Sequence, residues 1–197
     1  MNLINEKNWF FYKLLFNLKG YVVIDNFLKE DVCEHLRSYM LETENYSQVY
    51  DDYSAVDIVN IPELTKNLLN ISILKNKKFL RCWSFIYENI AKGVPPHADS
   101  ASINVNIWIT PDDCILDNNK NGLNIWGVES PKDWDWNDYN KDHLRIENFL
   151  SDKKPINIKY KYNRAIIFKS KYFHSTSGVS TKPGHRNKRI NYTFLFE

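Results

Sequence analysis

The fold class is decided by the stretch SINVNIWIT, residues 102–110. Its apolar side chains at 103, 105, 107 and 109 alternate with Asn104, Asn106 and Trp108. Strict alternation is the period of a β-strand with one buried apolar face. The two asparagines cannot be buried against an apolar layer without hydrogen-bond partners. We therefore predict a strand whose second face points into a cavity inside a barrel or sandwich.

Segments on both sides of this strand complete a mainly β pattern. Further strands are predicted at residues 79–87, 122–126, 156–162, 164–168 and 190–196. The N-terminal part reads instead as helices at 6–18, 29–41 and after Pro62, with Gly20 ending the first and a strand at 21–25 following it. Residues 42–60 are expected to form a loop, and 128–152 a long irregular excursion rich in tryptophan. Helices followed by at least six short strands indicate a β-sandwich or barrel with flanking N-terminal helices.

Length and composition are typical of one globular domain over residues 1–197. We divide it into a helical and β flank at about 1–78 and a β core at about 79–197, with an insertion near 128–152. The net charge of +2 gives no basic excess that would require nucleic acid. The three cysteines are scattered and odd in number, and no apolar run is long enough to span a membrane. Residues 1–16 lack an uninterrupted apolar stretch, so we expect no signal peptide. We expect a cytoplasmic protein that binds neither nucleic acid nor membranes; its oligomeric state is not specified.

Two short motifs carry the chemistry. Pro95-Pro96-His97-Ala98-Asp99-Ser100 supplies one imidazole and one carboxylate, and Phe173-His174-Ser175 supplies a second imidazole. Two imidazoles and a carboxylate can bind one face of Fe(II) and leave the opposite face open. Each motif by itself fits a simpler interpretation, in which His97 and Asp99 bond the backbone of a turn and His174 packs beside Phe173.

An arginine on a late strand adds a possible anion site. Arg189 shares one side of the predicted strand with Asn191 and Thr193. A guanidinium can bind a carboxylate, such as the distal one of 2-oxoglutarate, through two parallel hydrogen bonds. Arg186 lies nearer the preceding turn and is the alternative for this role.

In order, these motifs resemble the Fe(II)/2-oxoglutarate-dependent dioxygenases, most closely the phytanoyl-CoA dioxygenase-like branch. His97-x-Asp99, the distal His174 and Arg189 match the pattern of that family. The surrounding text is also similar, in GYVVIDNFL at 20–28, WITP at 108–111, NGL at 121–123 and NRAIIF at 163–168. The resemblance covers roughly residues 20–30 and 80–196, and its specificity comes from the order and spacing of these segments.

The resemblance implies a double-stranded β-helix (jelly roll, cupin-like) with an iron site near one mouth. His97, Asp99 and His174 would hold Fe(II), and Arg189 with Asn191 would hold 2-oxoglutarate. Asn106 would contact this cosubstrate or orient a ligand. With O2, the implied reaction is hydroxylation of a small-molecule substrate with release of succinate and CO2, and desaturation stays open. The alternative function is a non-catalytic jelly-roll protein that binds a metal or a small ligand.

The chain departs from the family in two places. Relatives often carry Ser where this chain has Asn191, and the stretch between His174 and Arg189 is somewhat long, which keeps Arg186 as the alternative clamp. The substrate cannot be read from the sequence. Tyr87, Trp108, Trp126 and the segment 134–136 are candidate pocket linings, and the excursion at 128–152 would act as a lid if it folds over the mouth.

Overall fold

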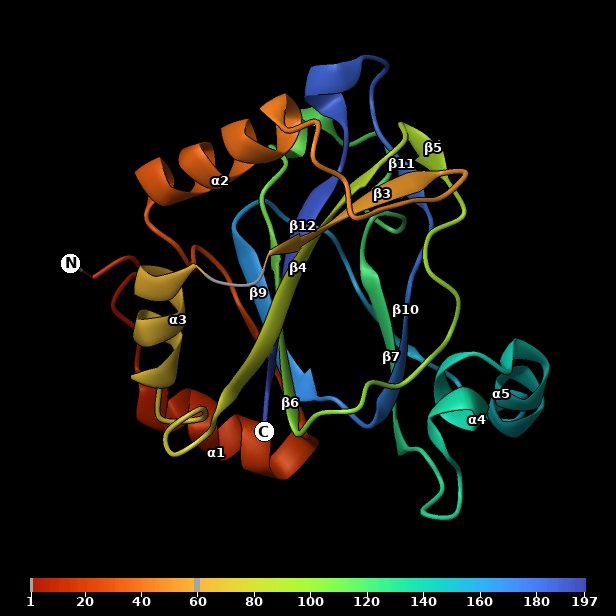
Figure 1. The fold of residues 1–197 in the computed structure, drawn as a ribbon. Helices are drawn as coiled ribbons and strands as arrows, with labels where there is room; N and C mark the ends of the chain where they lie inside the picture. The colour runs from red at the N-terminus through yellow and green to blue at the C-terminus, as the bar shows by residue number, and fades with distance from the viewer. Residues whose placement is uncertain (1, 59–60) are drawn as a thin grey trace.

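Two antiparallel β-sheets face one another, and three helices cover the outer side of the larger sheet (Figure 1). The structure is a computed structural model, and it describes residues 2–58 and 61–197. The mainly β fold with flanking N-terminal helices is confirmed. No helix in the described part of the chain is long and apolar enough to cross a membrane.

The elements follow one another in an order that places most helices first. They are α1 (Trp9–Lys19), β1 (Tyr21–Ile24), α2 (Glu30–Glu42), β2 (Gln48–Val49), β3 (Tyr53–Ile58), α3 (Pro62–Leu69), β4 (Phe79–Tyr87), β5 (Ile90–Ala91), β6 (Ile103–Trp108), β7 (Leu123–Glu129), α4 (Trp136–Asn140), α5 (His143–Leu150), β8 (Ile156–Ile158), β9 (Arg164–Lys169), β10 (Tyr172–Thr176), β11 (Val179–Ser180) and β12 (Ile190–Phe196). Two short 3-10 helices, η1 (Asp112–Cys114) and η2 (His185–Asn187), lie in the connections.

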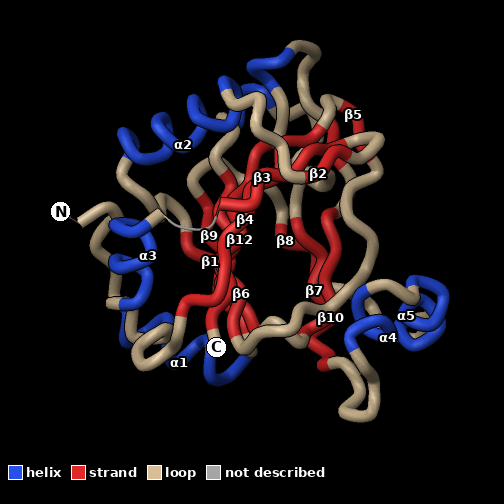
Figure 2. Tube along the Cα trace, viewed as in Figure 1, coloured by secondary structure: helices blue, strands red, loops and turns tan. Residues whose placement is uncertain are grey.

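The larger sheet has seven strands in the order β1-β9-β6-β12-β4-β3-β2. A three-stranded sheet, β10-β7-β8, faces it, and β11 pairs with β5 at one end (Figure 2). Strands β1, β2 and β3 come from the N-terminal flank, so flank and core share one sheet. Strands that are neighbours in the sheet are often far apart in the sequence, as expected for a jelly roll.

The two faces of the larger sheet differ in chemistry, as the alternation at 102–110 predicts. Val105 on β6 lies opposite Phe194 on β12, and both belong to the apolar core beneath the helices. Helix α2 contributes Leu36 and Met40 to this core, and α3 adds its own leucines. On the inner face, Asn106 lies opposite Thr193 in the register of the same two strands. A single sheet therefore separates an apolar core from a polar interior.

Local signals at the helix ends are confirmed with small shifts of the boundaries. Gly20 ends α1 with φ of 75°, a left-handed conformation, and its N–H donates to the carbonyl of Phe16 at 2.7 Å. Pro62 stands at the first position of α3.

The prediction of a loop over residues 42–60 holds for residues 43–47 and 50–52 but is wrong for 48–49 and 53–58. Strands β2 and β3 form a hairpin there, and β3 pairs with β4 from Tyr53 opposite Tyr87 to Ile58 opposite Cys82. The segment is polar because it lies at the edge of the sheet, so its strand character comes from pairing rather than from an apolar pattern. Residues 59 and 60 of the predicted loop lie outside the described residues.

The excursion at 128–152 is also more regular than expected. Strand β7 continues to Glu129, and α4 and α5 follow. Asp135 accepts from the N–H of Asp138 in a capping box, and Asp142 accepts from the N–H of Arg145. The two capping aspartates are the sequence signals for these helices. Helices of five and eight residues are too short to show a helical period of apolar residues. The strand predicted at 156–162 ends at Ile158.

Candidate metal centre

His97, Asp99 and His174 are brought together by backbone pairing. His97 and Asp99 lie in the connection between β5 and β6, whereas His174 lies in β10. The N–H of His97 donates to the carbonyl of His174 at 3.0 Å, and the reverse bond measures 2.9 Å. The N–H of Asp99 donates to the carbonyl of Ser170 at 2.9 Å. The connection thus runs beside β10 as a short extended segment, with His97 and Asp99 on one side and Ala98 on the other.

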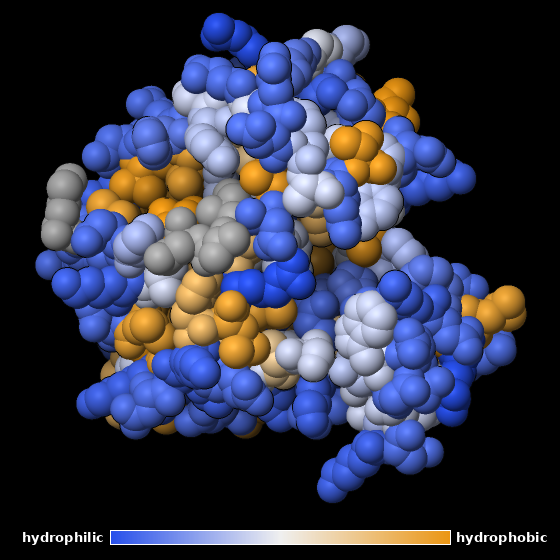
Figure 3. All heavy atoms as spheres, in the orientation of Figure 1, coloured by the Kyte–Doolittle hydropathy of each residue, from blue (hydrophilic) through white to orange (hydrophobic). Residues whose placement is uncertain are grey.

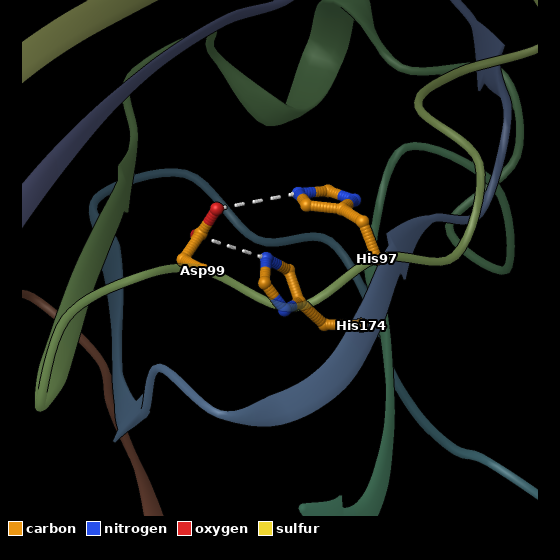
Figure 4. A group of neighbouring side chains, drawn as sticks. All are labelled: His97, Asp99 and His174. Carbon is orange, nitrogen blue, oxygen red and sulfur yellow. Dashed lines mark ion pairs between the residues drawn. The ribbon is translucent and has the colours of Figure 1, made fainter. Parts of the chain in front are cut away.

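The three side chains point toward one another (Figure 4). One ligand atom from each lies within 4.8 Å of the others. The Nε2 atom of His97 is 3.8 Å from Oδ1 of Asp99, and the Nε2 atom of His174 is 3.5 Å from Oδ2 of the same carboxylate. This is the donor set of a two-histidine, one-carboxylate site with its ligands on one face.

Hydrogen bonds fix which imidazole nitrogen faces the site. Nδ1 of His97 is 2.9 Å from the carbonyl of Pro95, and Nδ1 of His174 is 2.9 Å from the carbonyl of Tyr172. A carbonyl only accepts, so Nδ1 carries the proton and Nε2 keeps its lone pair toward the site in the neutral ring. Burial, with the neighbouring His174, lowers the pKa of His97 to about 4, which keeps this ring neutral at pH 7.

Asp99 is held as a carboxylate by its neighbours. Burial acts to raise its pKa, but the neighbouring His174 and His97 and the amide of Asn104 together lower it below its ordinary value. The Nδ2 atom of Asn104 donates to Asp99 Oδ2 at 2.7 Å, and Ser170 Oγ donates to Asn104 Oδ1 at 2.7 Å. Sequence reasoning placed Asn104 inside the fold but did not connect it or Ser170 with Asp99.

The tryptophan-rich insertion supports the triad from behind. The carbonyl of Tyr139 accepts from the N–H of Ala98 at 2.8 Å, and Nδ2 of Asn140 donates to the carbonyl of Ala98 at 2.9 Å. Ala98 and Phe173 also pack against α5 in a small apolar cluster that includes Trp126 and Trp134. Of the linings expected from the sequence, the described wall of the triad cavity includes Tyr87 but not Trp108, Trp126 or residues 134–136. No described residue of the insertion lines the cavity, so the insertion does not form a lid over it.

The triad opens into a cavity between the two sheets. Its wall includes Asn106, Asn191 and Thr193 from the inner face of the larger sheet, with the rings of Phe85 and Tyr87. Nδ2 of Asn106 donates to Thr193 Oγ1 at 2.8 Å, whereas its buried Oδ1 has no hydrogen-bond partner in the described structure. In the space-filling view the front of the molecule is hollowed between the region of β3 and the region of α4 and α5 (Figure 3).

Arg189 is buried beside this cavity, with 1% of its surface exposed. Its Nε donates to the carbonyl of Asn121 at 2.7 Å, and its Nη1 donates to Asn191 Oδ1 at 2.7 Å. The guanidinium carbon lies 4.8 Å from the ring centre of Tyr87, and the rings of Trp108 and Tyr160 are also close. Burial lowers its pKa from the ordinary value, but an arginine stays charged in proteins.

No carboxylate of the described chain pairs with Arg189. Its neighbourhood also contains the buried Trp108 Nε1, which has no hydrogen-bond partner in the described structure. Arg186, the alternative clamp, is exposed in η2. Of the two arginines considered for the clamp, Arg189 is buried beside Asn191 and Arg186 is exposed.

Comparison with protein families finds no family model that matches this chain, and no curated protein matches it. Solved structures do match. An oxidoreductase of the 2OG-Fe(II) oxygenase family from Burkholderia pseudomallei aligns over 98% of this chain and 92% of its own, with a TM-score of 0.57 and 13% identity. HygX from Streptomyces hygroscopicus, solved with nickel and 2-oxoglutarate bound, aligns over 98% of this chain and 87% of its own, with a TM-score of 0.64 and 10% identity.

A third match is the non-heme α-ketoglutarate-dependent epimerase SnoN from nogalamycin biosynthesis, with a TM-score of 0.67 and 10% identity over 96% of this chain and 82% of its own. At these identities the likeness is one of fold. The chain has the jelly-roll fold of these oxygenase structures, and the predicted double-stranded β-helix is confirmed.

Proposed function

We propose that the protein is a non-haem Fe(II)- and 2-oxoglutarate-dependent oxygenase that hydroxylates a small molecule and releases succinate and CO2. One observation carries the proposal. The donor atoms of His97, Asp99 and His174 line a cavity whose wall includes Tyr87 and Asn191. Both of these residues contact the buried Arg189, which has no acidic partner among the described residues.

The donor chemistry fits ferrous iron. Two neutral imidazoles and one carboxylate form a facial set that leaves the remaining metal positions open to other ligands. The histidine tautomers are fixed by the carbonyls of Pro95 and Tyr172, and Asp99 is oriented by Asn104. When bound, Fe(II) supplies the oxidative chemistry with 2-oxoglutarate and O2, while the residues supply binding, orientation and exclusion of water.

Arg189 fits the distal carboxylate of 2-oxoglutarate. Leaving a buried charge without a partner is costly, and a bound carboxylate would remove that cost. Asn191 holds one guanidinium nitrogen in place and itself lines the cavity. Oδ1 of Asn106 and Nε1 of Trp108, which have no hydrogen-bond partner among the described residues, are further polar groups on the same inner face. The structure of HygX, which has the same fold, contains nickel and 2-oxoglutarate.

The preference for hydroxylation rests on the carboxylate of the triad. Asp99 fills a position at the metal that a halide would need, so halogenation is disfavoured. Structures of the same fold include an epimerase, a carbocyclase and a prolyl hydroxylase with a peptide fragment. Fold alone does not select among such outcomes. The narrow cavity between the sheets favours a small-molecule substrate in this chain.

An anaerobic titration of Fe(II)-loaded protein with 2-oxoglutarate tests the proposal. We expect a weak visible charge-transfer band in the wild type, which disappears in His174→Ala and weakens in Arg189→Ala. Arg186→Ala is the matched control, because this arginine is exposed, and its band is expected to equal that of the wild type. Bound iron without any band would contradict the proposal and favour a non-catalytic metal-binding or ligand-binding jelly roll.

A further inference from the structure

A second hollow adjoins the triad cavity on the inner side of the larger sheet. Trp83 and Phe85 of β4 line both spaces. The register of β3 and β4 explains the hollow, because Ala55 lies opposite Phe85 and Asp57 lies opposite Trp83. Side chains at these paired positions point to the same face. The methyl group of Ala55 leaves space where a longer side chain would fill the surface.

The hollow has a volume of about 240 Å³. Cavities for drug-sized ligands measure roughly 300–1,000 Å³, so this space suits a single ring rather than a long chain. It shares the side chains of Trp83 and Phe85 with the triad cavity. A ligand seated here would place one edge toward the metal ligands.

The lining combines aromatic rings with four polar side chains, of which Ser47 already bonds the backbone of Ala55 and Asp57 through its hydroxyl. Asp57 offers an acceptor, and Arg81 offers donors. Tyr50 donates to the side-chain oxygen of Gln48, which leaves the amide NH2 of Gln48 as a donor. Arg81 also lies over the ring of Trp83, 5.2 Å from its centre. The opposite charges of Asp57 and Arg81 cancel, so the hollow does not select a strongly charged ligand.

The pairing of Asp57 with Arg81 is easily exchanged for a ligand. Their side chains are 44% and 55% exposed and meet through one contact of 2.9 Å. Exposed pairs of this kind contribute little to stability, because water screens the two charges. Hydroxyl groups, which both donate and accept, can therefore replace this contact at little cost. A purely apolar ligand would instead cover these polar groups without satisfying them.

We propose that this hollow, bounded by Ala55, Asp57, Arg81, Trp83, Phe85 and Gln48, is the substrate subsite and that it takes a hydroxylated saturated ring of the sugar or cyclitol type. The apolar face of the ring lies on Trp83 and Phe85. Its hydroxyl groups bond Asp57, Arg81 and Gln48, and the opposite edge extends toward the triad. The assignment rests on the proposed oxygenase function, because only that function makes the shared wall a route to the reacting centre.

Direct binding of two polyols tests the proposal. The probes are myo-inositol and methyl α-D-glucopyranoside, and the comparison ligands of similar size are cyclohexanecarboxylate and L-lysine. Binding is followed by tryptophan fluorescence and calorimetry. We expect at least one polyol to bind more tightly than both comparison ligands and to increase succinate release by the protein supplied with Fe(II), 2-oxoglutarate and O2.

Variants locate the binding. Trp83→Ala and Asp57→Asn are expected to weaken polyol binding at least tenfold while leaving the 2-oxoglutarate charge-transfer band intact. Leu80→Ala, an exposed position one residue from Arg81 on the same strand, is the control and should bind as the wild type does. Failure of both polyols to bind, stronger binding of a comparison ligand, or unchanged binding in Trp83→Ala would overturn the assignment.

The two proposals fail in different ways. Polyol binding is also measured in protein free of metal and 2-oxoglutarate. A missing charge-transfer band with retained polyol binding would reject the oxygenase and keep the ring-binding hollow. A normal band without polyol binding would reject the hollow and keep the oxygenase.

Discussion

At the scale of single residues, Arg189 is a buried charge without an acidic partner in the described part of the chain. Removing an ion from water costs several kcal/mol even after the protein relaxes. The carbonyl of Asn121, the amide of Asn191 and the face of Tyr87 offset part of this cost. None of these groups is an anion, so the site gains most when a carboxylate binds.

The buried charge of Arg189 should make 2-oxoglutarate stabilise the fold. In the presence of Mn(II), 2-oxoglutarate at one hundred times its dissociation constant should add about 2.7 kcal/mol to the free energy of unfolding. For a domain of this size that corresponds to a rise in Tm of about 5–10 °C. Arg189→Met at the same ligand concentration should show little of the rise. An equal rise in this variant would contradict the assigned role, and thermal unfolding followed by circular dichroism decides.

Asn104 provides a second test at this scale, because it orients the carboxylate of Asp99. Asn104→Leu is expected to weaken Mn(II) binding by about 10- to 100-fold, the usual effect of losing a group that orients a metal ligand. Ser170→Ala removes only the next hydrogen bond and should have a smaller effect. Asn17→Leu on the exposed side of α1 is the control. Metal titration by calorimetry measures all four proteins, and equal affinities would exclude this role.

At the scale of elements, the α4–α5 insertion supports the strand segment that carries two of the three triad residues. Asn140→Ala removes the hydrogen bond to the carbonyl of Ala98 and should lower the free energy of unfolding by about 1 kcal/mol. Because Ala98 lies between His97 and Asp99, we also expect severalfold weaker Mn(II) binding. Asn137→Ala, exposed on the same helix, should change neither quantity. Loss of stability with unchanged metal affinity would mean that the insertion supports the fold but not the site.

Asp25, directly after β1, makes ionic contacts with Arg164 at the start of β9 and with Lys161 shortly before it. Arg164 Nε lies 2.6 Å from Asp25 Oδ1, and Lys161 Nζ lies 2.9 Å from Oδ2. The hydrogen bond from Arg164 lowers the pKa of Asp25, with a smaller part from Lys161. A lowered carboxyl pKa stabilises the folded state above the unfolded value of about 3.9, and this contribution is lost as the pH falls through the folded value.

Asp25→Asn therefore has a pH-dependent effect. At pH 7 it should lower the free energy of unfolding by roughly 0.5–1 kcal/mol, because Asp25 is 40% exposed and solvent screens the pair. Near pH 2 the difference from the wild type should shrink toward zero. Urea unfolding at both pH values measures it, and a difference that grows on acidification would contradict the sign.

At the scale of the whole molecule, the larger sheet separates the apolar core, which stabilises the fold, from the polar cavity that contains the triad. Its outer face packs against the helices, and its inner face carries Asn106, Asn191 and Thr193 toward the triad. Tyr192, between two inward residues, points outward and donates to the carbonyl of Leu36 in α2 at 3.0 Å. Adjacent residues of β12 thus serve different layers of the fold.

Phe194→Ala tests this separation. Truncating a fully buried phenylalanine should cost about 3–5 kcal/mol of unfolding free energy, measured in urea. At a temperature where the variant is folded, its Mn(II) affinity should stay within about twofold of the wild type, since Phe194 belongs to the outer core and does not line the triad cavity. A large loss of affinity in the folded variant would show that the two faces are coupled.

The sequence alone determined the features that depend on short-range geometry. Alternation over 102–110 and 190–196 fixes which side chains of β6 and β12 face inward, because successive residues of a strand point to opposite sides. Gly20 and Pro62 mark helix ends because their backbone conformations are local properties. The order of His97, Asp99, His174 and Arg189 carried the resemblance to the oxygenases.

Only the tertiary structure decided which of these residues meet. The pairing of His97 with His174, the contact of Asn104 with Asp99 and the burial of Arg189 under Tyr87 depend on strand register and on the facing of two sheets. The hairpin of β2 and β3 likewise exists because β4 offers an edge to pair with. Such contacts join residues far apart in the chain, and no local pattern encodes the register that creates them.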